Sequence, residues 1–310
     1  MTALICGSVA FDTVMVFRGR FRDHILPDRI HLLNVSFLVP SLKRNFGGCA
    51  GNIAYNLALL GGAGAPMATV GHDFAPYGAW LRERSVDLTH VRGIADEYTA
   101  QAFITTDLDD NQITAFHPGA MSHSHVNRVP SGAGITLGVV APDGRDGMLQ
   151  HAAQFAEAGI PLLFDPGQGL PMFDGAELLA FVARATWVAV NDYEGQLLAE
   201  RTGLPLAELA RRVRALIVTR GAEGSVIHAE GREITIPAAR PAQVVDPTGC
   251  GDAYRAGLIY GLQHGLDWET TGRIASLLGA IKIAHAGTQH HRFTRDEFAD
   301  RFRAAFGRAL

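Results

Sequence analysis

The chain has 310 residues, of which 47% are hydrophobic and 19% are charged, and this composition is typical of a globular protein with a large core. A net charge of −4 gives no support for nucleic-acid binding, and no run reaches the about 20 apolar residues of a membrane span. Three widely spaced cysteines and an N-terminus without a signal-peptide pattern favour a cytoplasmic protein.

Short apolar runs alternate with longer amphipathic segments along the chain. The predicted strands are residues 4–8, 67–71, 135–140, 161–165, 187–190 and 216–219. The predicted helices lie near residues 50–61, 75–85, 146–158, 174–184, 192–202, 250–264 and 267–286. This alternation predicts an α/β fold with a mostly parallel central sheet flanked by helices. Ligands of such folds bind beyond the carboxyl ends of the strands.

Two excursions interrupt this alternation. Residues 13–46 contain two strand-like segments, the second at 30–39, and residues 97–119 contain a hairpin around the turn Asp107–Asn111. We interpret the excursions as one small β-sheet lid inserted in a single domain that spans residues 1–310. A pair of surface hairpins without a role in function is the alternative. The exposed strand edges of a lid are compatible with a monomer or a homodimer.

The strongest chemical signal is the turn Gly249-Cys250-Gly251-Asp252, directly before a predicted helix. Small residues at a helix start expose backbone N–H groups at the positive end of the helix dipole, which suits an anion. A carboxylate there would repel a phosphate, but it suits a base that takes a proton from a hydroxyl while the amides hold the charge on a transferring phosphoryl group. The turn therefore predicts a phosphotransfer centre. A plain glycine-rich helix cap is the alternative.

Two motifs nearer the N-terminus suit a sugar. Phe46–Asn52 is a second glycine-rich helix entry, in which Gly48 lets a ligand approach the backbone and Asn52 offers a donor and an acceptor. Asp12 follows the first strand, where a carboxylate can accept hydrogen bonds from the two hydroxyls of a ribose. Tight helix packing in the first case and a turn cap in the second are the alternatives.

Two motifs in the second half of the chain suit a nucleotide. Asn191 and Glu194 share a face at a helix start, where their oxygens can hold Mg²⁺ directly or through water, and a capping box is the alternative. Thr219, Gly221 and Gly224 link a strand to a predicted hairpin. They form either an ordinary turn or a backbone cradle for a nucleotide.

These motifs in this order resemble the ribokinase-like (PfkB) family of carbohydrate and nucleoside kinases, over essentially the whole chain. Within that family the chain looks most similar to bacterial nucleoside kinases of the adenosine kinase type. The resemblance is carried by the segments Phe46–Asn52, Asp107–Gly119, Phe164–Pro171, Asn191–Glu194 and Asp246–Asp252. Pro247 and Cys250 replace the Thr and Ala of the commonest family signature, and neither change removes a catalytic group.

The resemblance implies a ribokinase-like fold and an ATP-dependent kinase. Asp252 would deprotonate the acceptor hydroxyl, while the amides of Gly249, Cys250 and Gly251 would form the anion hole. Mg²⁺ and the phosphates would be organised by Asn191 and Glu194. The ATP site would be lined by Asn191, Thr219, Gly221 and Gly224, and the sugar would be held by Asp12, Gly48 and Asn52. A potassium site is built in many relatives at the positions of Asp246, the Thr248 carbonyl and the backbone near Ala286 and Gly287.

The leading interpretation is phosphorylation of the 5′-hydroxyl of a purine nucleoside, adenosine first, with inosine and guanosine as alternatives. A nucleoside needs a flat apolar slot for its base. Phe103 and Phe116 lie on opposite arms of the lid hairpin, and we expect both to face the base, where stacking contributes about 1–3 kcal/mol per base. Ordinary packing within the lid is the alternative. Gln168 can hydrogen-bond a purine edge.

Two other functions are compatible with these motifs. A sugar kinase for ribose or a related furanose is the first alternative. A non-catalytic nucleoside- or nucleotide-binding protein is the second, and the intact Asp252, Asn191 and Glu194 argue against it. A dehydrogenase is disfavoured because the chain lacks an early strand–GxGxxG–helix unit. The expected partners are therefore a small-molecule nucleoside and ATP.

Overall fold

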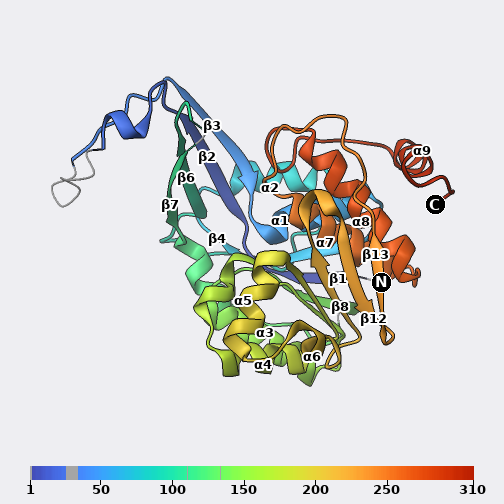
Figure 1. The fold of residues 1–310 in the computed structure, drawn as a ribbon. Helices are drawn as coiled ribbons and strands as arrows, with labels where there is room; N and C mark the ends of the chain where they lie inside the picture. The colour runs from blue at the N-terminus through green and yellow to red at the C-terminus, as the bar shows by residue number, and fades with distance from the viewer. Residues whose placement is uncertain (1, 26–33, 110, 133) are drawn as a thin grey trace.

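The computed structural model describes residues 2–25, 34–109, 111–132 and 134–310. The strands are β1 (Thr2–Cys6), β2 (Ala10–Val16), β3 (Ser41–Gly47), β4 (Gly64–Val70), β5 (Val91–Gly93), β6 (Ala100–Thr106), β7 (Gln112–His117), β8 (Ile135–Val140), β9 (Leu162–Phe164), β10 (Trp187–Asn191), β11 (Ala215–Thr219), β12 (Ser225–Ala229) and β13 (Arg232–Ile236). The α-helices are α1 (Cys49–Leu59), α2 (Ala75–Arg82), α3 (Arg145–Glu157), α4 (Gly175–Arg184), α5 (Asp192–Thr202), α6 (Leu206–Ala210), α7 (Cys250–Gln263), α8 (Trp268–Ile283) and α9 (Arg295–Phe306). Figure 1 shows two helical layers that enclose a large sheet, and a smaller sheet that projects from one end.

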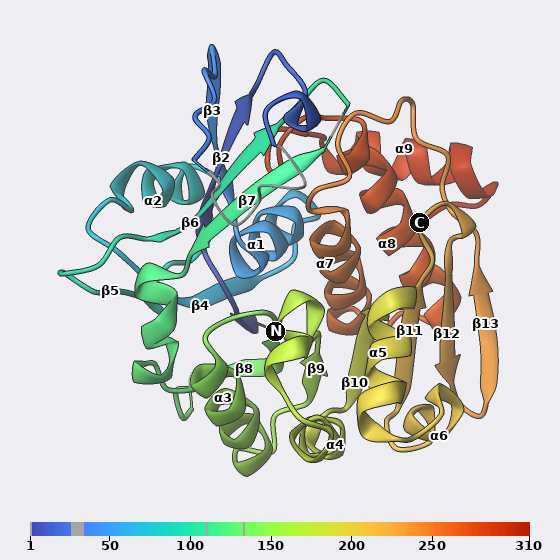
Figure 2. The same ribbon diagram turned by 60° about the vertical axis from the view of Figure 1, so that its left-hand side comes forward.

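The large sheet has nine strands in the order β13-β12-β11-β10-β9-β8-β1-β4-β5. The strands from β11 to β5 pair in parallel, and β12 and β13 extend the sheet in the antiparallel sense. Neighbouring residues of β1 enter different cores, since Ile5 packs with Leu57 and Leu4 packs with Phe164. Helices α1, α7 and α8 cover one face, and α3, α4 and α5 cover the other (Figure 2). The predicted mostly parallel sheet between two helical layers is confirmed.

The smaller sheet has the order β3-β2-β6-β7 and is built from the two excursions. The predicted hairpin is present as β6 and β7. Of the strand predicted at residues 30–39, residues 30–33 lie outside the described residues, and residues 34–39 form no strand. The partner strand β2 ends at Val16 opposite Ser41, so the chain before Ser41 has no neighbour to pair with, and the strand is β3 instead.

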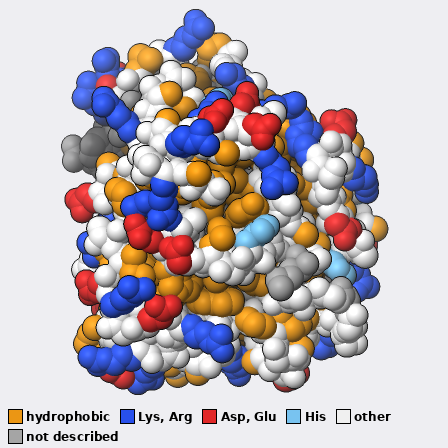
Figure 3. Space-filling model, turned by 90° about the vertical axis from the view of Figure 1, so that its right-hand side faces the viewer, with side chains coloured by type: hydrophobic (Ala, Val, Ile, Leu, Met, Phe, Trp, Pro, Cys, Tyr) orange, Lys and Arg blue, Asp and Glu red, His pale blue; other side chains and the backbone are white. Residues whose placement is uncertain are grey.

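Besides β3, the elements β5, α6 and α9 are not predicted from the sequence. Helix α9 is mostly polar, and its buried residues are Phe298 and Phe302, four residues apart. Its sequence signal is the capping box formed by Thr294 and Glu297. On the face that carries α9, apolar side chains gather around a hollow (Figure 3). Within the described ranges, no helix has the length and apolar character that crossing a membrane requires.

Candidate active site

Asp252 lies in the first turn of α7, where it faces the start of α1. Its carboxylate accepts a hydrogen bond from Asn52 Nδ2 at 2.8 Å. The N-cap Gly249 has φ +78°, a left-handed conformation that glycine adopts without strain. The starts of α1 and α7 therefore meet at Asp252, and the loop before β2 contacts the start of α1 through Ser8.

The start of α7 is open at Gly251. This glycine is exposed, and a Cβ added to it would meet no atom within 4 Å. The first N–H groups of a helix have no carbonyl partner inside the helix, so those at the start of α7 are suited to an anion. Cys250 differs from the expectation, because its N–H donates to the Pro247 carbonyl at 3.1 Å and is used inside the turn. The anion-hole prediction therefore depends on Gly249 and Gly251 and is wrong for Cys250 in this conformation.

The surroundings of Asp252 bring its pKa close to neutrality. Burial raises the pKa to about 7, and the charge of Asp165 adds to this rise. Hydrogen bonds from Asn52 and Cys49 and the charge of Arg255 lower the pKa. Both protonation states are therefore populated near pH 7, which suits a group that accepts a proton and returns it.

A buried chain of amides orients Asn52. Gln289 Nε2 donates to Asn52 Oδ1 at 3.0 Å, and Trp80 Nε1 donates to Gln289 Oε1 at 3.0 Å. The amide nitrogen of Asn52 is thereby turned toward Asp252. The sequence predicted a sugar contact for Asn52, whereas the structure places its side chain, only 3% exposed, against the carboxylate. Gln289 lies in a loop after α8 and gives no signal in the sequence.

Arg255 supplies a cation behind Asp252. Its Nη2 donates to Asp165 Oδ1 at 3.0 Å and lies 3.9 Å from Glu194 Oε2. Its Nε and Nη1 are buried and have no partner among the described residues. Burial and the charge of Asp165 raise the pKa of Glu194, and Arg255 opposes this rise. A role for Arg255 is not predicted from the sequence, although a lone charge within the apolar part of α7 is a usable signal.

The predicted nucleotide residues lie at the ends of two neighbouring strands. Asn191 ends β10 and is the register partner of Thr219 at the end of β11. Asn191 Oδ1 accepts from the Glu194 N–H at 2.7 Å, and Glu194 Oε2 accepts from the Asn191 N–H at 2.8 Å. This is the capping box named as the alternative. Glu194 Oε1 takes no part in the capping box. This oxygen can therefore bind Mg²⁺ directly or through water.

Gly221 and Gly224 differ in what surrounds them. Both have positive φ, +53° and +88°. A Cβ at Gly224 would overlap the Ile236 carbonyl, so the hairpin itself requires this glycine. A Cβ at Gly221 would meet nothing within 4 Å, which leaves that stretch of backbone accessible. The expected nucleotide cradle therefore depends on Thr219 and Gly221.

Asp12 and Gly48 lie on the other side of Asp252. A Cβ at Gly47 would overlap the Asp12 carboxylate, so the backbone of β3 covers it closely. Burial, with the charge of Asp246, raises the pKa of Asp12 to about 6. Gly48 has φ +85°, and a Cβ there would lie 2.6 Å from the Ser8 carbonyl oxygen. The backbone of Gly48 therefore packs closely against the loop that contains Ser8. This is the tight packing named as the alternative to a sugar contact.

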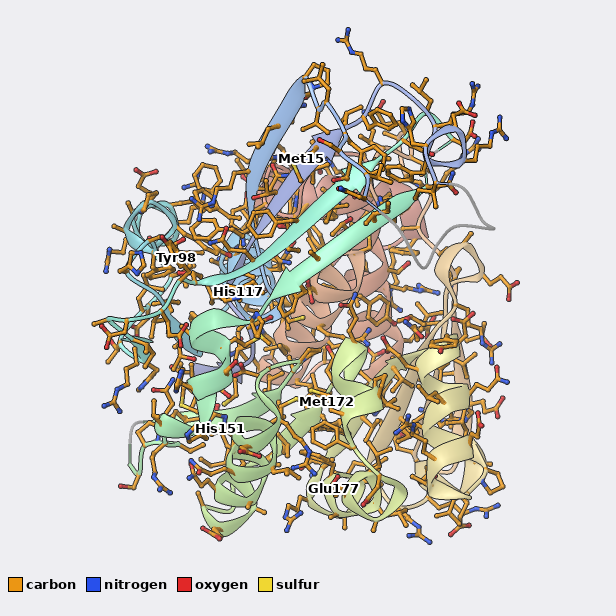
Figure 4. All side chains as sticks on the ribbon, turned by 90° about the vertical axis from the view of Figure 1, so that its left-hand side faces the viewer. Met15, Tyr98, His117, His151, Met172 and Glu177 are labelled. Carbon is orange, nitrogen blue, oxygen red and sulfur yellow. The ribbon has the colours of Figure 1, made fainter. Side chains whose placement is uncertain are left out.

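The two lid phenylalanines do not face one ligand. Ala102 pairs with Phe116, and Phe103 pairs with Ala115, so the two rings lie on opposite faces of the sheet. Asp12 pairs with Ala102, which places Phe116 on the Asp12 face. The expectation that both rings face the same base is therefore wrong, because at most one of them can do so. His117 marks the end of β7, where the lid meets the main body (Figure 4).

Two predicted positions remain. Gln168 is exposed in the short 3₁₀ segment Gly167–Met172 that follows β9. The Asp246 carboxylate accepts from the Thr248 N–H at 2.9 Å and from the Gly287 N–H at 2.8 Å. Burial opposes ionisation, but these hydrogen bonds and the charge of Lys282 hold the pKa of Asp246 below its usual value. Asp246 thus fastens the turn before α7 to the end of α8.

Comparison with known proteins identifies the chain. Residues 9–294 match the family described as pfkB family carbohydrate kinase. The chain belongs to this family. It is 31% identical over 270 residues to the nucleoside kinase of Methanocaldococcus jannaschii, with 86% of this chain and 89% of that protein covered. It is 30% identical over 309 residues to the nucleoside kinase of Methanothermobacter thermautotrophicus, with 98% and 96% covered.

Solved structures of a bacterial nucleoside kinase are similar over nearly the whole pfkB kinase chain. The nucleoside kinase of Burkholderia thailandensis in complex with inosine is 54% identical, with a TM-score of 0.91 and 99% of both chains covered. The same kinase in complex with ADP-inosine gives a TM-score of 0.88. The ribokinase-like fold with a small second sheet and the assignment as an ATP-dependent kinase are thereby confirmed.

Proposed function

We propose that this kinase phosphorylates the 5′-hydroxyl of a purine nucleoside. The observation that carries the proposal is the Asp252 carboxylate, held 2.8 Å from Asn52 at the open start of α7 with a pKa of about 7. Two archaeal relatives are nucleoside kinases, and the Burkholderia kinase binds inosine, which supports a purine nucleoside. Adenosine, inosine and guanosine are the candidate substrates.

Asp252 acts as the base in the proposed transfer. It accepts the proton of the 5′-hydroxyl as that oxygen attacks the γ-phosphorus of ATP, and the bond from this phosphorus to ADP breaks. The N–H groups at the start of α7, including that of Gly251, stabilise the charge on the transferring group. Arg255 neutralises the carboxylates behind the site, which would otherwise repel the phosphates. Closure of the lid excludes water and prevents hydrolysis of ATP.

Mg²⁺ is the expected metal of this reaction. Glu194, with Asn191 beside it, supplies the hard oxygen donors that Mg²⁺ prefers, directly or through water. When bound with ATP, the ion would neutralise charge on the phosphates. Thr219 and Gly221 lie at the end of the next strand, which supports placing the nucleotide along this edge.

The lid supplies one aromatic face for the base. Phe116 is 52% exposed and lies on the Asp12 face, whereas Phe103 is on the other face. Phe116→Ala should raise KM for the nucleoside by roughly 5- to 100-fold, as loss of a base-stacking contact predicts. Phe103→Ala is the matched control and should leave that KM within about twofold. Equal effects of the two substitutions would contradict the assignment of the base to the Asp12 face.

A substrate panel tests the proposed function. Adenosine, inosine, guanosine, ribose and fructose are each supplied with ATP and Mg²⁺ in an assay that measures ADP. We expect turnover of at least one nucleoside and little turnover of the free sugars. Turnover of ribose or fructose alone would establish a sugar kinase instead. Nucleoside binding without any turnover would indicate a binding protein.

A further inference from the structure

Lys282 is a buried cation at the end of α8. Its side chain is fully buried, and its Nζ donates to the Asp246 carbonyl at 2.6 Å and to the His285 carbonyl at 3.3 Å. The Asp246 carboxylate lies 3.9 Å from the same nitrogen. The ammonium group is thus surrounded by two carbonyl oxygens and one carboxylate.

The choice of lysine here is unusual for this chain. Only two of its 27 basic residues, Lys43 and Lys282, are lysines. A lysine presents a compact point charge, whereas an arginine presents a broad planar fork that needs several aligned acceptors. Carbonyl and carboxylate oxygens around a point charge are also the ligands of a hard monovalent cation. An ammonium group has the charge of K⁺ and nearly its radius.

The oxygens that contact Lys282 overlap those expected for a metal ion. The family resemblance implies potassium at Asp246, Thr248 and the backbone near Ala286. In the structure, the Asp246 carbonyl and carboxylate face Lys282, and the carboxylate is also bonded by the N–H groups of Thr248 and Gly287. The residues therefore do not fit a potassium ion, because a positive charge already lies among its ligands.

The position of Lys282 connects it to the start of α7. The Asp246 N–H donates to the Ile283 carbonyl at 3.1 Å, and the Asp246 carbonyl accepts from Lys282 Nζ. The end of α8 therefore holds Asp246 through both its N–H and its carbonyl. Asp246 in turn fixes Thr248, which lies next to the N-cap Gly249. The conformation of the turn that presents Gly251 and Asp252 thus depends on a cation at this point.

We propose that the Lys282 ammonium group is a tethered monovalent cation that takes the place of potassium and holds the turn before α7. The kinase then needs no free K⁺. Removing the amine leaves oxygen ligands without a cation, and the variant becomes responsive to K⁺ or NH₄⁺. The activity readout rests on the proposed function, whereas the stability readout does not.

The test compares cations at constant ionic strength. Thermal unfolding and kinase turnover are measured in KCl, NH₄Cl, NaCl and choline chloride. The wild-type Tm and turnover should be the same in KCl and choline chloride. For Lys282→Ala in choline chloride, we expect Tm to fall by about 5–10 °C, as loss of one partner of a buried ion pair predicts, and turnover to fall at least tenfold. KCl or NH₄Cl should restore part of both losses, and NaCl should restore less.

Two control variants and two contrary outcomes make the test decisive. Lys282→Met keeps most of the apolar stem, so it separates loss of the charge from loss of packing. Lys43→Ala removes the other, exposed lysine and should give no difference in Tm between KCl and choline chloride. Several-fold activation of the wild type by K⁺ over choline would overturn the proposal. So would a Lys282→Ala chain whose Tm is the same in KCl, NH₄Cl and choline chloride, whether that chain folds well or poorly.

Discussion

Helices α1 and α7 begin with nearly the same residues and use them differently. Each starts after a glycine with positive φ, Gly48 at +85° and Gly249 at +78°, followed by a cysteine. At α1, the N–H groups of Cys49 and Ala50 donate to the hydroxyl and the carbonyl of Ser8, at 3.0 and 2.9 Å. At α7, the exposed Gly251 has open space around it.

This difference explains what a glycine-rich helix start can do. The first N–H groups of a helix need acceptors from outside it. Where the protein supplies them, as Ser8 does for α1, the glycines serve packing and the helix start positions a side chain, here Asn52. At α7 the protein supplies an acceptor for the Cys250 N–H but leaves Gly251 open, so this helix start is available to an anionic ligand. We therefore expect substitutions at the two starts to fail in different ways.

The largest effect is expected at Asp252. Asp252→Asn removes the base but keeps the shape of the side chain, so kcat should fall by about 10²–10⁴, the usual range for a general base. Nucleoside affinity, measured by calorimetry, should change only a few-fold. Asp267→Asn is the control, since Asp267 caps α8 through the Thr270 N–H and lies at another helix start. It should change stability by only a few tenths of a kcal/mol, because Asn caps a helix about as well as Asp, and it should leave kcat unchanged. Near-normal kcat in Asp252→Asn would remove Asp252 from the role of base.

A smaller effect with a distinct signature is expected at the start of α1. Asn52→Leu removes the donor to Asp252, and kcat/KM should fall about tenfold to 100-fold, the value of a hydrogen bond to a charged group. In the wild type, kcat/KM should rise as the pH increases through about 7, because the base must lose its proton. The Asn52 hydrogen bond lowers the pKa of Asp252, so the midpoint should move to higher pH in the variant.

A neighbouring residue provides the control for this shift. Asn56 is also buried in α1, and its Nδ2 donates to the Asn52 carbonyl at 2.8 Å rather than to Asp252. Asn56→Leu should lower stability to a similar extent and leave the midpoint of the pH profile in place. If both variants moved the midpoint equally, the effect would come from general loosening of α1 and not from the bond to Asp252.

The comparison of α1 and α7 also shows what the sequence could predict. Asp252, Asn191 and Thr219 follow strand and helix boundaries, and a parallel sheet brings such boundaries to one edge. The contact of Gln289 with Asn52 joins residues 237 positions apart, and no local pattern encodes it. Equally, nothing local shows that Ser8 occupies the amides at Cys49 and Ala50, so the two helix starts look alike in the sequence.

The lid shows a second limit. Its hairpin was predicted with nearly correct bounds, because alternation and a polar turn are local signals. Which face each ring occupies is set by register, and a shift of one residue moves a side chain to the other face. Phe103 and Phe116 are separated in this way. Arg255 and Lys282 each stand out as a charge inside an apolar helix, but the oxygens that surround them come from distant parts of the chain, so no local pattern predicts their roles.

The smallest effects on activity are expected from two glycine substitutions that separate stability from function. In Gly51→Ala, the new Cβ would overlap the Tyr77 hydroxyl, which donates to the Gly47 carbonyl at 2.8 Å. This overpacking should destabilise the protein by about 1–3 kcal/mol and lower its Tm.

In Gly251→Ala, the Cβ meets no atom within 4 Å, and alanine favours a helix over glycine by about 1 kcal/mol, so the Tm should not fall. If phosphates approach the backbone at the start of α7, the added methyl should raise KM for ATP a few-fold in Gly251→Ala. Tm should therefore fall only in Gly51→Ala, because the protein itself fills the space at the start of α1. KM for ATP should rise only in Gly251→Ala, because the start of α7 is left to the ligand. An unchanged KM for ATP in Gly251→Ala would place the anion elsewhere on this edge.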